Sequence, residues 1–276
     1  MVRRPRTEVR GIKLKCGADN SLSVPNELIP GINAVEEALH AERKLLHIIV
    51  SRDSDIARSP LIKDARRRHI QVRFADRGAL DSLVGKGRHQ GIVAVAEARP
   101  PALFDEIFDE ARKRKEQPFI AILDGVEDPQ NLGAVIRSAE SAGVHGIILP
   151  ERRAANISPA VHKASAGAVE YMKIVRVPNL PHALSLCRDR GLWLIGAEAH
   201  GEKSLFEEDL RGPLAFVIGG EDTGLSRPVA ERCDRIVKIP MTGHIRSLNV
   251  SATAAVLFFE KKRQEAGQKG KSPENK

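Results

Sequence analysis

The chain has 276 residues, enough for one or two domains of roughly 100–200 residues each. Its 42% hydrophobic and 29% charged residues give the balance of a globular protein, which excludes a disordered or fibrous one. Aromatic residues make up only 4%, too few for a surface that grips single strands mainly by base stacking. No run approaches the roughly 18 apolar residues of a membrane span.

The formal charge of +8 is concentrated at the two ends of the chain. Residues 1–15 carry six basic side chains and one acidic one, and residues 261–276 carry six and two. Residues 1–26 and 265–276 are predicted to be flexible basic tails. Such tails suit a nucleic-acid backbone, because each neutralised phosphate releases counterions. Tails that only aid solubility would have the same composition, so charge alone favours nucleic acid without establishing it.

Residues 27–99 predict a small α/β domain. Apolar residues recur at helical spacing in some segments and form short strand-like runs in others. Residues 58–88 carry nine Lys or Arg against three Asp, which indicates either an RNA-facing surface or a solvated helix face. The expected elements are helix 31–44, strand 45–51, helix 60–69, strand 70–74, helix 78–84 and strand 91–96.

A second α/β domain is predicted over residues 118–264. Pro100 and Pro101 interrupt the pattern, and residues 100–117 are predicted to be a linker that includes a charged helix. Strands and helices then alternate, and the strands are continuous apolar runs, which predicts a parallel sheet covered on both faces. The expected strands are 119–123, 144–149, 172–177, 192–197, 214–218 and 236–239. The expected helices are 131–142, 159–169, 180–190, 227–232 and 249–263.

The three cysteines, Cys16, Cys187 and Cys233, are widely spaced and form no Cys/His cluster. Reduced thiols and no metal site are therefore expected. The first ten residues are charged and no apolar stretch follows them, so no secretory signal is expected. A cytoplasmic protein is the resulting prediction.

Ligands of open parallel sheets bind beyond the carboxyl ends of the strands, where this chain has three polar segments. In the first, Asn131 is expected in the turn after a strand and Arg137 in the following helix. The two lie about 240° apart on an ideal helix and do not share a face. An arginine in a mostly apolar helix needs a partner or a cleft, and a structural ion pair is an equal alternative.

The second segment, residues 218–225, places paired glycines and Glu221 after an apolar strand, where the backbone can approach a ligand closely. The third runs from Ile239 to residue 251, and its Ser247 and Asn249 stand where a helix cap is expected. The G-x-G-x-x-G fingerprint of dinucleotide-binding folds occurs nowhere in the chain, which disfavours a dinucleotide-dependent oxidoreductase.

Together these segments resemble the SpoU, or TrmH-like, branch of the SPOUT RNA methyltransferases, in order and spacing as well as composition. The matching segments are DPQNLGAVIRSAESAG (128–143), KASAGAVE (163–170), FVIGGEDTGLS (216–226) and IVKIPM…SLNVSATAA (236–255). GINAVEEAL (31–39) and HQGI (89–92) are similar to the small ribosomal-protein-like domain that binds substrate in many members.

The resemblance implies an α/β fold with a parallel-sheet catalytic domain, a C-terminal trefoil knot and a small N-terminal α/β domain. It implies S-adenosylmethionine as cofactor, RNA as substrate and a homodimer with each active site near the subunit interface. The implied catalytic residues are Asn131, Arg137, Glu221, Ser247 and Asn249. The implied cofactor-binding residues are Ala197, Gly219, Ile239 and Leu248.

The resemblance assigns Arg137 a role as general base, but a guanidinium stays protonated in proteins. We therefore expect Arg137 to position a phosphate and the reacting hydroxyl, with late proton loss, and Glu221 to orient Arg137 or the knot loop. Two departures, Gly220 and Arg246, stand beside the motifs and are expected to affect substrate choice only.

The expected reaction is methylation of a ribose 2′-hydroxyl, with a guanosine of large-subunit ribosomal RNA as the preferred target. Transfer RNA is the rival substrate. A non-catalytic RNA-binding or ribosome-assembly factor on the same fold is the rival function, which a missing Arg137 or Asn249 would have favoured.

Overall fold

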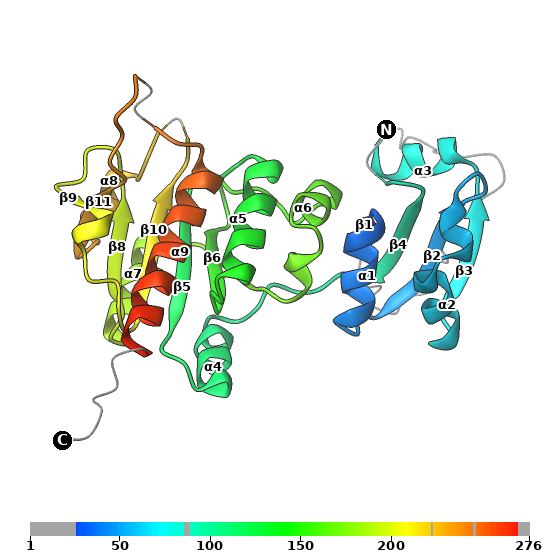
Figure 1. Cartoon of the computed structure of the whole chain (residues 1–276), viewed down its shortest axis with the longest axis horizontal. Coiled ribbons are helices and arrows are strands. Elements are labelled where there is room, and N and C mark those ends of the chain that lie inside the picture. The colour runs from blue at the N-terminus through cyan, green and yellow to red at the C-terminus, as the bar shows by residue number, and fades with distance from the viewer. Residues whose placement is uncertain (1–25, 86–88, 222, 245–246, 270–276) are drawn as a thin grey trace, which may run out of the picture.

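The described residues form two α/β domains that follow one another along the chain (Figure 1). The computed structural model describes residues 26–85, 89–221, 223–244 and 247–269. Most of the expected N-terminal tail, with Cys16, lies outside these ranges, and so does Arg246. Among the described residues, no helix is both long enough and apolar enough to cross a membrane.

The first domain is a mixed four-stranded sheet in the order β1-β4-β2-β3. Strand β2 pairs antiparallel with β4 and parallel with β3. Alternate strand residues face opposite ways, so Ile48 packs with α1 and α2 on one face while Ile49 packs with α3 on the other. The elements are β1 (Asn26–Pro30), α1 (Ile32–His40), β2 (Leu45–Ser51), α2 (Pro60–Arg67), β3 (Gln71–Ala75), α3 (Arg77–Val84) and β4 (Ile92–Glu97), with a 3₁₀ turn at Asp55–Arg58.

The second domain is a seven-stranded sheet in the order β7-β6-β5-β10-β8-β11-β9, and all its strand pairs are parallel. The predicted parallel sheet is thus confirmed. Its strands are β5 (Phe119–Asp124), β6 (Gly146–Pro150), β7 (Lys173–Val177), β8 (Trp193–Ala197), β9 (Lys203–Ser204), β10 (Leu214–Gly219) and β11 (Arg235–Lys238). Its helices are α4 (Phe104–Arg114), α5 (Pro129–Ser141), α6 (Pro159–Ala164), α7 (Leu180–Asp189), α8 (Arg227–Ala230) and α9 (Val250–Lys269), with 3₁₀ turns at Ala168–Glu170 and Leu205–Glu207.

Helices cover both faces of this sheet, as its continuous apolar strands predict. Along β5, Ala121 and Leu123 join the core under α5 and α9, while Ile120 and Ile122 join the core under α4, α7 and α8. Burial of apolar side chains on both faces is the main stabilising contribution to this domain.

Two predicted boundaries differ from the structure. Helix α4 is no free linker, because its Ile107 and Phe108 are buried in the core, and Ile107 occupies the space that a Cβ on Gly146 would need. The C-terminal tail is shorter than predicted, because α9 continues through Lys269. Buried Lys261 holds this helix to the loop before β10, donating to the carbonyl oxygens of Leu210 at 3.0 Å and Gly212 at 2.9 Å.

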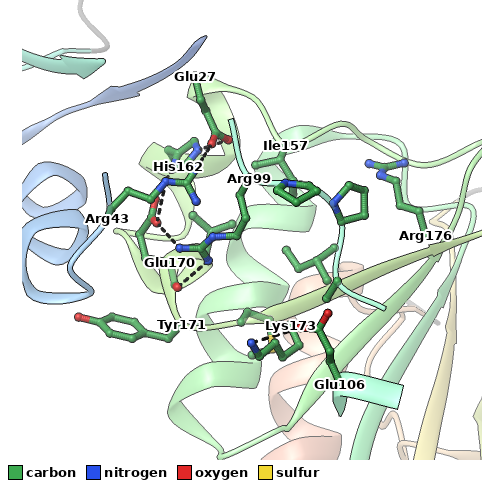
Figure 2. Close-up of a pocket in the computed structure, with 16 residues that line it drawn as sticks. Glu27, Arg43, Arg99, Glu106, Ile157, His162, Glu170, Tyr171, Lys173 and Arg176 are labelled. Atoms are coloured by element: carbon green, nitrogen blue, oxygen red, sulfur yellow. Dashed lines mark hydrogen bonds and ion pairs between the residues drawn. The ribbon is translucent and has the colours of Figure 1, made fainter. Parts of the chain in front are cut away.

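The two domains meet where α6 packs against β1, and charged side chains join them. His162 Nε2 lies 2.8 Å from Glu27 Oε1, and Arg43 Nη2 lies 2.5 Å from Glu27 Oε2. Arg99 Nη2 donates to Glu170 Oε2 at 3.1 Å (Figure 2). Burial alone would raise the pKa of Glu27, but the hydrogen bond and charge of His162, together with Arg43, outweigh burial and hold it below its usual value.

A cavity of about 280 Å³ opens at this junction, between the Arg99–Ala102 connection and strand β7 (Figure 2). It shares no lining residue with the cavities at the carboxyl ends of the strands described below. The contacts around it position one domain against the other.

Candidate active site

Four neighbouring strands of the second sheet end at the same edge, and the loops that follow three of them form a cavity of about 340 Å³. These strands are β5, β10, β8 and β11. The loops after β8, β10 and β11 line the cavity together with the start of α9. All four residues predicted to bind the cofactor line it, as does Ser247: they are Ala197, Gly219, Ile239 and Leu248. We call it the cofactor cavity.

The turn after β10 forms one wall of the cofactor cavity and is held from both sides. A Cβ on Gly219 would lie 2.1 Å from the carbonyl carbon of Gly224, so only glycine lets the two ends of the turn meet. Glu198 Oε1, beyond β8, accepts from the Leu225 amide at 3.0 Å. Asp124 Oδ2, at the end of β5, accepts from the Ser226 amide at 2.7 Å. Carboxylates on both neighbouring strands therefore fix the turn.

The lining of the cofactor cavity fits S-adenosylmethionine. Apolar side chains such as Ile218 and Ile239 offer contact to a flat purine, and the glycine turn offers backbone polar groups at close range. The carboxylates of Glu198 and Glu221 suit a ligand that carries ammonium and sulfonium charges. No cluster of three or more His, Cys, Asp or Glu side chains suited to a metal occurs in the described part of the chain.

Three of the predicted catalytic residues meet in one polar cluster beside this cavity. Asn249 Nδ2 donates to Asn131 Oδ1 at 2.9 Å and also to Glu221 Oε1. Asn249 Oδ1 accepts from the Ser251 amide at 2.9 Å, so the same side chain caps α9, as its position in the sequence predicts. The Asn249 amide thus joins α5, the turn after β10 and α9. Its nitrogen donates to Asn131 and Glu221, and its oxygen caps α9.

Two details differ from the predictions. Asn131 lies in the first turn of α5 and not before the helix. Asp128 caps α5 by accepting a hydrogen bond from the Asn131 amide at 3.0 Å, and Pro129 occupies the first helical position. Glu221 bonds to Asn249 within the chain, and no described contact joins it to Arg137.

Arg137 stands apart from the cluster. It lies on the exposed side of α5, lines none of the cavities described, and makes no hydrogen bond or ion pair with the described residues. The structural ion pair considered as an alternative is therefore not found within this part of the chain. The structure agrees with the expectation that Arg137 and Asn131 do not share a face.

A second cavity, of about 320 Å³, adjoins the cofactor cavity. Gly220, Glu221, Thr223 and Val250 line both cavities. The second cavity is otherwise lined by Gly125, Val126, Glu127, Asp128, Asn131 and Arg153. Glu221 of the polar cluster thus lines both cavities and Asn131 lines the second, an arrangement suited to transfer of a group between two bound molecules.

Sequence reasoning missed Glu198, and it did not foresee the packing role of Gly220. A carboxylate directly after an apolar strand was the available signal for Glu198. A Cβ on Gly220 would lie 2.4 Å from the Gly125 carbonyl oxygen, so this glycine lets two turns pack together.

Burial raises the pKa of the Cys187 and Cys233 thiols to about 12, which leaves neither as a reactive thiolate.

The chain is similar to known proteins over most of its length. The 23S rRNA (guanosine-2′-O-)-methyltransferase RlmB of Pectobacterium atrosepticum is 38% identical over 251 residues, covering 88% of this chain and 100% of the relative. The protein of the same name from Xanthomonas campestris is 39% identical over 248 residues, covering 89% and 100%. The SpoU methyltransferase AviRb of Streptomyces viridochromogenes, solved in complex with the cofactor AdoMet, is similar in structure. Its TM-score is 0.73 at 26% identity, over 87% of this chain and 91% of that one.

Family comparisons divide the chain as the fold does. Residues 28–102 match the family described as RNA 2′-O ribose methyltransferase substrate binding. Residues 118–259, which hold both cavities and the polar cluster, match the SpoU rRNA Methylase family. The chain therefore belongs to the SpoU family of RNA methyltransferases.

Proposed function

We propose that this protein transfers a methyl group from S-adenosylmethionine to the ribose 2′-hydroxyl of a guanosine in 23S ribosomal RNA, in the cytoplasm. The observation that carries the proposal is the junction of the two cavities at Glu221, which Asn249 joins to Asn131 by hydrogen bonds. The relatives named for the same reaction on 23S rRNA guanosine support the substrate. The trefoil knot stays a prediction of the family resemblance.

The chain's own residues orient the reacting hydroxyl. The bound cofactor supplies an activated methyl group. Asn249, whose amide nitrogen donates to both Asn131 and Glu221, fixes these two side chains at the junction, where their polar groups hold the ribose in line with that methyl group. Ser247, two residues before Asn249 in the sequence, lines the cofactor cavity and adds a hydroxyl group to its wall. Holding the two reactants at close range supplies much of the rate acceleration, since no covalent intermediate is needed.

We further propose that the protein acts as a homodimer and that Arg137 reaches the active site of the partner. Arg137 is exposed and unpaired in this part of the chain, while Leu132, Val135 and Ile136 bury the other face of α5. A second copy related by twofold symmetry would present Arg137 to the other copy's second cavity, where it would hold a phosphate beside the target ribose.

Arg137→Ala is expected to lower methyl transfer by about 10²–10³-fold, the typical loss on removing one contact made in the transition state, while cofactor affinity stays unchanged. Arg137→Lys keeps the positive charge but removes the planar guanidinium group. Near-normal turnover in this variant would show that the guanidinium is not needed.

Mixing inactive Arg137→Ala and Asn249→Asp subunits tests the dimer. If Arg137 acts across the interface, each mixed dimer has one complete site, and random pairing restores up to about one quarter of wild-type activity. If Arg137 acts within its own subunit, the mixture stays inactive. A monomer in sedimentation experiments would contradict the dimer directly.

The proposed reaction is tested by incubating the purified protein with labelled S-adenosylmethionine and unmodified large-subunit rRNA, with bulk transfer RNA as a parallel substrate. We expect label on one guanosine ribose of the rRNA. Label on transfer RNA alone would overturn the substrate and keep the chemistry. Cofactor binding without transfer to either RNA would favour a ribosome-assembly factor.

A further inference from the structure

The second cavity is where the target base must lie, if the proposed function holds. The reacting ribose lies at the polar cluster, with the methyl donor on one side. Its base then extends away from the cofactor, into the cavity bounded by residues 125–128 and Arg153. The cavity's volume of about 320 Å³ lies within the range of roughly 300–1,000 Å³ usual for small-ligand sites.

Two side chains of opposite charge line this cavity without a structural task of their own. Glu127 Oε1 lies 3.7 Å from Arg153 Nε, and the side chains are 63% and 61% exposed. An exposed ion pair at this distance contributes little to stability. The other two carboxylates are engaged: Asp128 caps α5 and Glu221 accepts from Asn249. Glu127 is therefore the carboxylate most available to a ligand.

The backbone fixes the two loops that carry these side chains relative to each other. The Ala155 amide donates to the Val126 carbonyl at 2.9 Å, which ties the loop after β6 to the turn after β5. Arg153 has a φ of +59°, a left-handed conformation that is strained for a residue with a Cβ. Its Nη2 lies 3.7 Å from the position a Cβ on Gly125 would take, so the guanidinium extends over the glycine floor of the cavity.

We propose that Glu127 and Arg153 recognise guanine in the target nucleotide. Guanine carries an acceptor, O6, directly beside a donor, N1–H, so a guanidinium and a carboxylate in contact with each other can bind both at once. Arg153 donates to O6 and N7, the commonest specific contact of arginine with a base. Glu127 accepts from N1–H and from the 2-amino group, because a carboxylate has two acceptor oxygens.

The same pair rejects the other bases. Adenine and cytosine carry a donor where guanine has O6 and an acceptor where guanine has N1–H, so both contacts become unfavourable. Uracil keeps one contact to each side chain but has neither the 2-amino group nor N7. Full engagement of both side chains therefore requires guanine.

The test changes single atoms of the base. The modified nucleotide is first mapped with labelled cofactor and then rebuilt by splinted ligation into full-length large-subunit rRNA as guanosine, inosine or 7-deazaguanosine. Inosine lacks the 2-amino group that Glu127 would bind, and 7-deazaguanosine lacks the N7 that Arg153 would bind. The wild-type kcat/KM is expected to fall by about tenfold for each analogue.

In Glu127→Ala, kcat/KM is expected to be the same for inosine as for guanosine, while the fall for 7-deazaguanosine remains. In Arg153→Ala, the fall for 7-deazaguanosine is expected to disappear, while the fall for inosine remains. Arg152→Ala, which changes an exposed arginine outside the cavity, should keep both penalties. Penalties that persist in the Glu127 and Arg153 variants would overturn the inference and leave the methyltransferase function intact. An equal loss on all three RNAs in Arg153→Ala would show a phosphate contact and also overturn it. Absence of methyl transfer to any RNA by the wild type would instead overturn the proposed function.

Discussion

Asn249→Asp is expected to reduce methyl transfer by about 10²–10³-fold while the protein stays folded and binds its cofactor. Asp replaces the amide nitrogen by a second oxygen, so the donor to Asn131 and Glu221 is lost and a carboxylate is placed against Glu221. The cap on Ser251 survives, because an Asp oxygen accepts the same amide hydrogen. Single-turnover kinetics with saturating cofactor measure the loss.

Asn249→Ala is the matched comparison for this variant. It removes both roles, so it should lose the same activity and in addition about 1 kcal/mol of stability from the missing helix cap. The difference in Tm between the two variants therefore combines the lost cap with the carboxylate repulsion that Asn249→Asp adds. Wild-type turnover in Asn249→Asp would show that the hydrogen bonds donated by Asn249 have no part in the reaction.

Gly219→Ala is expected to weaken S-adenosylmethionine binding by at least about 100-fold. The added Cβ would meet the Gly224 carbonyl carbon at 2.1 Å, and this neighbour is backbone that cannot rotate away. The turn after β10 must then move, and with it the wall of the cofactor cavity that Glu198 and Asp124 hold in place. Titration calorimetry with the cofactor measures the effect.

Gly243→Ala provides the control, because a Cβ there meets nothing within 4 Å. It should bind cofactor like the wild type. Circular dichroism of Gly219→Ala distinguishes a displaced turn from general unfolding. Unchanged cofactor affinity in a folded Gly219→Ala would mean that the turn does not contact the cofactor.

Much of the fold could be predicted because apolar periodicity is a local property. Strand β2 was predicted at Leu45–Ser51 with both ends correct, from its continuous apolar run. Strand β1 was missed because Leu28 and Ile29 are its only strongly apolar residues and Pro30 ends it. The packing of α4 could not be read from its charged sequence, since burial of Ile107 depends on a glycine in a distant strand.

In the active site, too, local motifs identified residues, whereas contacts between distant segments could not be predicted. Motif resemblance identified Asn131, Glu221 and Asn249, but their mutual hydrogen bonds depend on three elements separated by up to 118 residues in the chain. Helix geometry predicted that Arg137 and Asn131 do not share a face, but not that Arg137 is exposed without a partner among the described residues. The contact between His162 and Glu27, 135 residues apart, could not be predicted from the sequence around either residue.

The charged contact between the domains has a consequence for how the protein responds to salt. His162 and Glu170 are almost fully buried, and Arg43 nearly so, whereas the basic side chains of α2, such as Arg66 and Arg67, are exposed. Ions in solution screen exposed charges strongly and buried ones weakly. Rising ionic strength therefore weakens contacts between exposed cations and phosphates well before it separates the domains. The protein meets its RNA with the two domains already aligned, so the entropy cost of fixing their orientation is not added to the cost of binding.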